Sequence, residues 1–451
     1  MFLPAEIIPV IACFRPAFTE TTYQKAVELI VGTVLARGRR TVASALRAIG
    51  KGQARGWSKY HHVLNRAKWS GLKVSRLLLA LIVATFVPKA GIVTIAVDET
   101  LERRWGPQIR KCGHWRDSRS SSKRLQVSSR GLRWLVFAVV VHVPWTAYAL
   151  ALPFLSVLLT TPKVSAALGK PHRTVAQVTG RIVPWLRRTL VGYPIHLVGD
   201  GAYAVLELGL TCQAHQVTLI APLRLDARLF EPPCRPLEKR KGRPSLVGAR
   251  LPNLANMAAA STTRWHRSRV AWYGATAAVM DWTTATALWY STGTPPLTIR
   301  WVLVRDPQGI YPTRAFFSTN LYLSPSTIIA GFVARWSLEV TYEESRAYLG
   351  IAPKGHPQRQ WSDLAIERTT PALFGLFSLV VLMAHALYPD GDLPCTQAAW
   401  YPKSSATFHD LLHLVRKTLW LHFLFQTGDL SPDLRKIMPA SFGHLLSAVC
   451  Y

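Results

Sequence analysis

Acidic residues are scarce in this chain of 451 residues. It has 24 Asp+Glu against 54 Lys+Arg, so its formal net charge is +30 and its pI is about 10.5. A charge of this size is extreme for a globular protein and indicates a polyanionic partner, nucleic acid before a membrane surface. Because neutralised phosphates release counterions, we expect binding that depends strongly on salt.

Cysteine is also sparse, and its positions exclude two classes of protein. The six cysteines lie far apart and form no Cys-x-x-Cys pair, at Cys13, Cys112, Cys212, Cys234, Cys395 and Cys450. This spacing argues against a zinc finger and against a disulfide scaffold, and it fits a reduced cytoplasm. The first twenty residues have no basic n-region, so we expect no signal peptide.

One long segment has no charge at all. Trp134–Leu159 contains 26 residues without Asp, Glu, Lys or Arg, which is long enough for a transmembrane helix. Pro144 and Pro153 interrupt it, however, and the pattern favours two buried strands joined by a tight turn at Pro144–Trp145. Phe374–Tyr388 is a shorter apolar run and predicts a buried helix. We therefore expect no membrane partner.

Two of the few acids follow short apolar runs. Asp98 ends Gly91–Val97 and Asp200 ends Ile195–Gly199, and both runs have the composition of buried strands. Open α/β sheets place their chemistry at the carboxyl ends of strands. The alternative for each acid is an ordinary turn residue or helix cap.

A third group of acids lies in Phe332–Gly350. Glu339, Glu343 and Glu344 fall close together there, between Arg335 and Arg346. If the segment is one helix, Arg335, Glu339, Glu343 and Arg346 share a face, and Trp336 and Leu349 can supply packing. The alternative is a salt-bridged surface helix. Two strand-end Asp residues followed by a helical Glu suit two-metal phosphoryl transfer, which uses hard oxygen ligands.

These residues resemble the DDE set of insertion-sequence transposases. The transposases related to insertion sequence 4 and transposon 5 carry Tyr-x2-Arg-x3-Glu-x6-Lys, and this chain has Phe332-x2-Arg335-x3-Glu339-x6-Arg346. Asp98-Glu99-Thr100 resembles the Asp-Asp-Thr of the insertion sequence 701 branch, and Asp200-Gly201-Ala202-Tyr203 resembles the second-acid motif. The spacing selects Glu339 as the third acid, and Glu343 and Glu344 are fallback ligands.

The resemblance implies a fold and a function. It implies an α/β, ribonuclease-H-like catalytic core with a β-rich insertion between the second and third acids, plus helical N- and C-terminal regions. It implies a DNA transposase that cleaves and transfers strands at transposon ends. Asp98, Asp200 and Glu339 would bind two Mg²⁺ ions, for which Mn²⁺ can substitute. The implied partners are double-stranded DNA, as terminal inverted repeats and target, and a second copy of the chain in a homodimer.

Composition divides the chain into five segments. We predict a helical DNA-binding domain at 1–88, core at 89–230, a β-rich insertion at 231–296, core with the Glu339 helix at 297–390, and a helical region at 391–451. The loop Arg103–Arg130 is too polar and basic for a core, which leaves a DNA-contacting or a solvated loop. The expected DNA contacts are Arg335, Arg346, Lys123, Arg124, Lys239, Arg240, Lys241, Trp265 and Trp272.

Several alternatives stay open. Trp265 and Trp272 lie among arginines, which suits stacking on unpaired bases, but packing within a small β-domain explains them equally. His409-Asp410-Leu411-Leu412-His413 is similar to a zinc motif in which Asp replaces Glu. At the level of function, the alternatives are a ribonuclease-H-like nuclease without strand transfer and a non-catalytic basic protein that binds membranes or nucleic acid.

Overall fold

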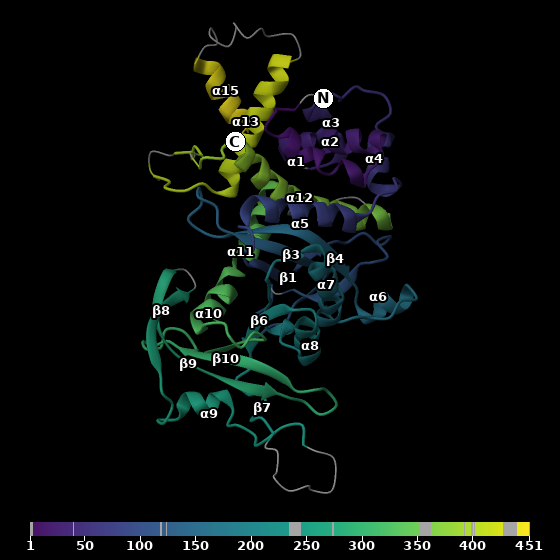
Figure 1. Cartoon of the computed structure of the whole chain (residues 1–451). Coiled ribbons are helices and arrows are strands. Elements are labelled where there is room, and N and C mark those ends of the chain that lie inside the picture. Colours follow the sequence, from purple (N-terminus) through teal and green to yellow (C-terminus); the bar gives the residue numbers. More distant parts are fainter. Residues whose placement is uncertain are drawn as a thin grey trace. The chain divides into compact units, whose positions relative to one another are not determined.

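The structure is a computed structural model that divides into two compact units. It describes residues 3–38, 40–117, 120–122, 124–233, 245–272, 275–351, 362–391, 393–397, 400, 402–426 and 440–450. Unit 1 comprises Met1–Val87, Glu99–His172 and Ser337–Tyr451, and unit 2 comprises Pro88–Asp98 and Arg173–Trp336. Figure 1 labels the elements of both units.

Helices dominate unit 1. They are α1 (Ile8–Ala12), η1 (Arg15–Ala17), α2 (Glu20–Leu35), α3 (Val42–Ala48), α4 (Ser58–Asn65), α5 (Gly71–Phe86), α6 (Pro162–Ala167), α11 (Ser337–Tyr348), α12 (Asp363–Leu387), α13 (Phe408–Gln426) and α15 (Ala440–Cys450). Side-chain caps start several of them, for example the Thr41 hydroxyl, which accepts from the Ser44 N–H. The expected helical character of the first 88 residues is thus present from α1 to α5.

The strands of unit 1 form an antiparallel group. The elements are β2 (Gly113–Arg116), β3 (Ser128–Val141) and β4 (Leu150–Leu159), and both β2 and β4 pair with β3. The β3–β4 pair is the charge-free segment, which confirms two buried strands in place of a membrane helix. Beside β3 lies β1 (Val93–Arg103), whose second half, from Glu99, belongs to this unit.

Unit 2 is built on a mixed sheet with the order β1-β5-β6-β11-β10-β9-β7. Its elements are α7 (Val175–Thr189), β5 (Ile195–Val198), η2 (Gly201–Tyr203), α8 (Leu206–Ala214), β6 (Val217–Leu223), β7 (Leu229–Phe230), α9 (Leu254–Ala259), β8 (His266–Trp272), β9 (Ala275–Trp289), β10 (Leu297–Arg305), β11 (Arg314–Ser318) and α10 (Pro325–Ala334). Strands β1, β5 and β6 are parallel, whereas β11, β10 and β9 run antiparallel. The remaining strand, β8, pairs with β9.

The core of unit 2 lies between α10 and one face of this sheet. Buried side chains from β5, β6, β8, β9, β10 and β11 meet Ile328, Ile329 and Phe332 of α10 there. The α/β class is confirmed. The antiparallel hairpin of unit 1 and the parallel strands β1, β5 and β6 of unit 2 are both elements that a ribonuclease-H-like core contains.

Helix α12 is the apolar helix that the sequence predicted at Phe374–Tyr388, and it begins earlier, at Asp363. In the described part of the chain it is the one helix whose length and composition would let it cross a membrane. Of its most apolar window, 67% is buried within the structure. Its Ser378 hydroxyl donates to the Pro153 carbonyl of β4, so the helix packs on the hairpin as a core helix.

Candidate active site

Asp98 and Asp200 lie on neighbouring parts of the sheet in unit 2. The register pairs Ala96 of β1 with Val198 of β5, and each acid lies two residues beyond its member of that pair. Strand β1 continues past Asp98 to Arg103, whereas β5 ends at Val198 and Asp200 starts the η2 turn. Because neighbouring strands are about 4.8 Å apart, this register brings the two acids to neighbouring positions. Both are partly exposed. The β5–β6 pairing extends past Val198, since the Gly199 N–H donates to the Ile220 carbonyl.

Each of the two acids already has a hydrogen-bond partner. Asp200 Oδ1 accepts from the Ala202 N–H at 2.8 Å and caps the short η2 turn. Asp98 Oδ2 accepts from Arg335 Nη1 at 2.7 Å, with only 9% of the Arg335 side chain and 16% of the Asp98 side chain exposed. The sequence did not predict this ion pair, because 237 residues separate its members.

Arg335 and Glu339 do not lie on one continuous helix, which corrects the prediction. Helix α10 ends at Ala334 with Arg335 as its C-cap, and α11 begins at Ser337. Trp336, between them, is 50% exposed, so it does not supply the expected packing. The spacing of Arg335, Glu339 and Arg346 fits an uninterrupted helix equally well, so the sequence pattern does not predict this break. Arg335 and Glu339 therefore belong to different units.

Helix α11 is anchored within unit 1. Its buried face contains Leu338, Thr341, Tyr342 and Ser345, and the Thr341 hydroxyl donates to the Ala151 carbonyl of β4 at 2.8 Å. Glu339 lies in the first turn and is partly exposed. Arg346 donates from Nη2 to the hydroxyl of buried Thr100 on β1. Arg346 is thus positioned on the strand that carries Asp98.

A buried network that the sequence analysis missed supports the same strand. Glu102 is 2% exposed and accepts four hydrogen bonds, from Nε and Nη2 of Arg104, from Trp134 and from Thr370. Asp98, Thr100 and Glu102 alternate along one face of β1, and each binds a side chain from elsewhere in the chain. In the sequence, the only indication of this network is the alternation of Asp98, Thr100 and Glu102 after the apolar run.

The two fallback acids have different surroundings. Glu343 is exposed, whereas burial raises the pKa of Glu344 to about 7. The Phe408 N–H, at the start of α13, donates to Glu344 and partly offsets this rise. Glu344 therefore helps to pack α11 against the start of α13, and these contacts do not favour it over Glu339 as a metal ligand.

Asp410, the acid of the zinc-like motif, also serves as a helix cap. It is 1% exposed and accepts from the N–H groups of Thr407 and Thr396 and from Lys403. Lys403 and these N–H groups outweigh desolvation and lower the Asp410 pKa to about 2. The motif therefore starts a helix.

The other predicted DNA contacts have different outcomes. Lys123, Lys239, Arg240 and Lys241 lie outside the described residues. Arg124 is exposed, and Trp265 is partly covered by Arg305, whose guanidinium carbon lies 4.1 Å from the ring centroid. Trp272 is 3% exposed and belongs to the core of unit 2, which corrects its assignment as a DNA contact. Its ring packs against apolar neighbours because β8 turns that face toward α10.

The basic loop before β3 is also less solvated than predicted. Arg104, Lys111 and Asp117 are all at least nine-tenths buried. Arg104 binds Glu102, Lys111 binds Glu367 of α12, and Asp117 accepts from Arg103 and Ser129. Glu102 and Glu367 neutralise the two buried cations, and Arg103 of the loop itself neutralises Asp117.

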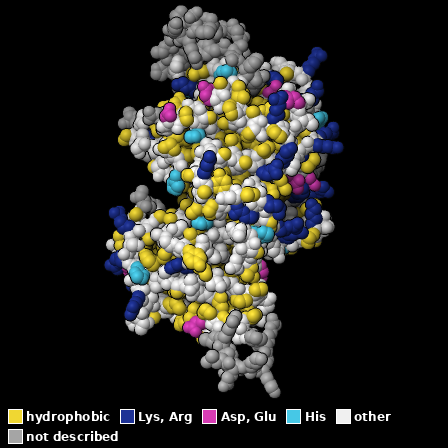
Figure 2. All heavy atoms as spheres, viewed as in Figure 1, with side chains coloured by type: hydrophobic (Ala, Val, Ile, Leu, Met, Phe, Trp, Pro, Cys, Tyr) yellow, Lys and Arg dark blue, Asp and Glu magenta, His cyan; other side chains and the backbone are white. Residues whose placement is uncertain are grey.

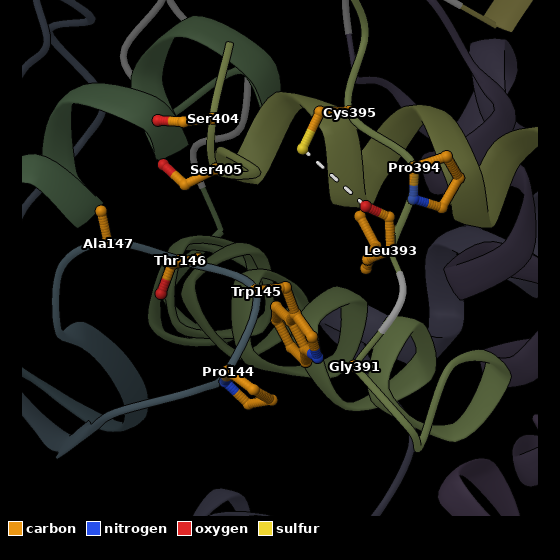
Figure 3. A pocket seen from close by; sticks show the side chains of 10 residues that line it. All are labelled: Pro144, Trp145, Thr146, Ala147, Gly391, Leu393, Pro394, Cys395, Ser404 and Ser405. Carbon is orange, nitrogen blue, oxygen red and sulfur yellow. Dashed lines mark hydrogen bonds between the residues drawn. The ribbon is translucent and has the colours of Figure 1, made fainter.

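A pocket of about 570 Å³ in unit 1 does not belong to this site. The turn after β3 and the segment after α12 line it, and Trp145 and Cys395 face its interior (Figure 3). Its lining residues include no Lys, Arg, His, Asp or Glu, so it has no charge for a phosphodiester or a cation.

The carboxylates of Asp98 and Asp200 fit a hard divalent cation in donor chemistry, because both offer oxygen ligands. Across the described residues, no three His, Cys, Asp or Glu side chains gather as a metal site. Asp98 and Asp200 lie in unit 2 and Glu339 lies in unit 1. The structure therefore supplies a two-carboxylate pair, to which Glu339 is a candidate third ligand.

Comparison with known proteins places this geometry in a family. The model of the DDE superfamily endonucleases matches residues 13–279, which include Asp98 and Asp200 but not Glu339. Because this match covers more than half of the chain, the protein belongs to the DDE superfamily endonucleases. Enzymes of this superfamily generally use divalent metals.

Other comparisons add little. No curated protein matches the chain. Among solved structures, the chain is similar to the piggyBac transposase in its synaptic complex with hairpin DNA. That match has a TM-score of 0.40 and 10% identity, and it covers 96% of this chain and 80% of that one.

Proposed function

We propose that this protein is a DNA transposase that cleaves the ends of a mobile element and joins them to target DNA. The observation that carries the proposal is the pair Asp98 and Asp200, each two residues beyond the paired residues Ala96 and Val198 of adjacent parallel strands. Family membership as an endonuclease supports cleavage chemistry, and the charge of +30 supports a nucleic-acid substrate. The similarity to the insertion sequence 4 and 701 groups supports strand transfer.

Asp98, Asp200 and Glu339 would hold two Mg²⁺ ions, or Mn²⁺ in their place. When bound, such ions lower the pKa of an attacking water or 3′-hydroxyl and stabilise the leaving oxygen. The protein would contribute the two carboxylates of unit 2, and Asp98 is oriented there by its ion pair with Arg335.

The two arginines would orient phosphates. Arg335 neutralises Asp98 in this structure, and its planar guanidinium can also donate hydrogen bonds to a phosphodiester. Arg346, which donates from Nη2 to the Thr100 hydroxyl, would supply a second guanidinium for a phosphate, as the resemblance implies. Figure 2 shows that Lys and Arg side chains greatly outnumber acidic ones on the face displayed, which suits a long DNA substrate.

Further features of the proposal follow from the resemblance. The DNA partners are terminal inverted repeats and target DNA, and a homodimer would hold two ends together. The protein would act in the cytoplasm of a bacterium, at the nucleoid. The second candidate function is DNA cleavage without strand transfer, which membership of a family of endonucleases favours as strongly as transposition.

The test uses charge-neutralising variants of the two strand acids. We expect Asp98→Asn and Asp200→Asn each to lower Mg²⁺-dependent cleavage of the DNA that borders the coding sequence by orders of magnitude. Affinity for the same DNA stays within about twofold of wild type, because the phosphate contacts lie elsewhere. Asp226→Asn is the matched control, since Asp226 is an exposed acid of the same unit paired with Arg224.

Two readouts separate the outcomes. Wild-type cleavage by Asp98→Asn or Asp200→Asn would remove the basis of the proposal. Joining of a cleaved 3′-end to a second duplex distinguishes the transposase from the nuclease, because the nuclease yields cut ends only. A melting curve for each variant shows whether the removal of the Arg335 partner has unfolded the protein.

A further inference from the structure

We infer that β8, β9 and β10 carry a preorganised phosphate clamp, in which Asp281 fixes Arg267 and Arg305 for contact with the backbone of duplex DNA. The inference rests on the proposed function for its substrate, DNA. It assigns a positioning role to an acid outside the candidate active site. The residues involved all belong to unit 2.

The clamp follows from strand register. Arg267 of β8 lies directly opposite Asp281 of β9, and Asp281 lies directly opposite Arg305 of β10. Directly opposed residues on neighbouring strands project from the same face of a sheet. Asp281 is therefore flanked by one arginine on each side, with about 4.8 Å between successive strands.

The hydrogen bonds fix both guanidinium groups. Arg267 donates from Nε to Asp281 Oδ1 at 2.7 Å and from Nη2 to Oδ2 at 3.2 Å. Arg305 donates from Nε to Oδ2 at 3.3 Å. The Asp281 side chain is only 4% exposed, whereas 62% of the Arg267 side chain and 40% of the Arg305 side chain are exposed. The acid is thus hidden below two cations that present their outer N–H groups to solvent.

Basic residues predominate around the clamp. Asp281 is the only acid between residues 245 and 305, and Asp306, directly after Arg305, hydrogen-bonds to backbone N–H groups of its own turn. Arg269 is exposed and follows Arg267 by two residues on the same face of β8, and Arg264 is exposed just before the strand. An ion pair that only stabilises the fold leaves no net charge at the surface, but here the single carboxylate of Asp281 pairs with two exposed arginines, which leaves a net positive charge. The charge is complementary to a polyanion.

The aromatic residues point to the DNA backbone as the partner in place of unpaired bases. The Trp265 ring is already occupied by Arg305, at 4.1 Å, and the Trp282 ring stacks on His266 with a centroid distance of 4.8 Å. Each of these rings therefore has one face covered by a side chain of the same unit. The cation–π contact instead provides a second hold on Arg305, in addition to Asp281. Phosphate oxygens are the groups that the exposed guanidinium edges fit.

The decisive test is Asp281→Asn in the full-length protein. The substitution adds one positive charge, so if the arginines act only as diffuse charge, affinity for a short duplex should rise or stay the same. The clamp predicts the opposite, a decrease of about three- to tenfold, because Arg267 loses its carboxylate partner and Arg305 keeps only the Trp265 ring. The slope of log K against log salt should also fall by about 1 for each phosphate that the protein no longer binds.

Asp226→Asn is the matched control. It makes the same chemical change, adds the same charge and also frees an arginine, Arg224, but that pair is exposed at 83% and 63% and spans no strands. We expect its affinity to equal or exceed that of wild type. If Asp281→Asn behaves like Asp226→Asn, the clamp is wrong, whether or not the protein cleaves DNA.

A second variant keeps the test informative if Asp281→Asn is unstable. Arg267→Lys preserves charge but cannot donate two parallel hydrogen bonds, and because its side chain is 62% exposed the melting temperature should hardly change. The clamp predicts weaker binding of the same duplex and a smaller salt slope. Wild-type affinity in Arg267→Lys would overturn it. Absence of salt-dependent binding in the wild type would instead contradict the proposed function.

Discussion

The contact between Arg335 and Asp98 allows a quantitative test of the candidate site. The two side chains form a hydrogen-bonded ion pair at 2.7 Å, and both are largely buried, with 9% and 16% exposed. A charge-assisted hydrogen bond of this kind contributes about 1.5–3 kcal/mol to stability. Removing the cation alone leaves a buried carboxylate without a partner, which costs about 3–5 kcal/mol. Arg335→Met should therefore be clearly destabilised in a denaturant melt.

Arg335→Lys separates folding from function. Lysine preserves the charge beside Asp98, so we expect the free energy of unfolding to fall by no more than about 1 kcal/mol. It offers a point charge in place of a planar fork and cannot hold Asp98 and a phosphate in one geometry. Because misplacement of about 1 Å can cost about a hundredfold in rate, we expect single-turnover cleavage to fall by about ten- to a hundredfold.

Arg346→Lys is the matched comparison. Arg346 gives one hydrogen bond to the single hydroxyl of Thr100, which an ammonium group can also provide, and the resembling family has Lys at that position. We expect cleavage within about threefold of wild type. Full activity in Arg335→Lys, with unchanged melting, would refute the argument that Arg335 orients the reacting phosphate.

Two further predictions concern the supports of the site. Gly199→Ala should lower both the melting temperature and the cleavage rate, because a Cβ at this position would lie 2.6 Å from the ring of fully buried Tyr203, close to Asp200. Gly201→Ala is the control: a Cβ there meets nothing within 4 Å, so its melting temperature and cleavage rate should match those of wild type. Glu344 has a pKa raised to about 7 by burial, so its contribution to stability is present at low pH and is lost as pH rises from the ordinary glutamate value of 4.5 through about 7. The free energy of unfolding of Glu344→Gln should therefore exceed that of wild type by up to about 3 kcal/mol at pH 8 and by little at pH 4, as measured by denaturant titrations at both pH values. An equal difference at the two pH values would contradict the raised pKa of Glu344.

Much of the local structure followed from short-range patterns. The runs before Asp98 and Asp200 are strands, and the charge-free segment is a hairpin because proline and the turn residues break its helical continuity. Thr174 begins α7 with a complete capping box. Such features depend on residues within a few positions of each other, so composition and spacing contain the information.

The same patterns misjudged side chains whose environment comes from distant segments. Trp272 lies among arginines in the sequence, which suggested an exposed binding residue, but β8 places its side chain in the core beside α10. Trp336 has the spacing of a packing residue, yet the break between α10 and α11 leaves it half exposed. The charge on Arg104 predicted solvent, but Glu102 neutralises it in the interior.

The sequence by itself determined the chemistry available to this protein: three acids in the order strand, strand and helix, two arginines near the third, and a large positive charge. Residue identities and local spacing are sufficient for that, because a carboxylate or a guanidinium brings its chemistry wherever it lies. Only the tertiary structure decided the partners. Strand pairing brings the segments that carry Asp98 and Asp200 together and places Asp281 between two arginines, and chain folding brings Arg335 to Asp98 across 237 residues. These contacts depend on register and packing between segments remote in sequence, and no local pattern encodes them.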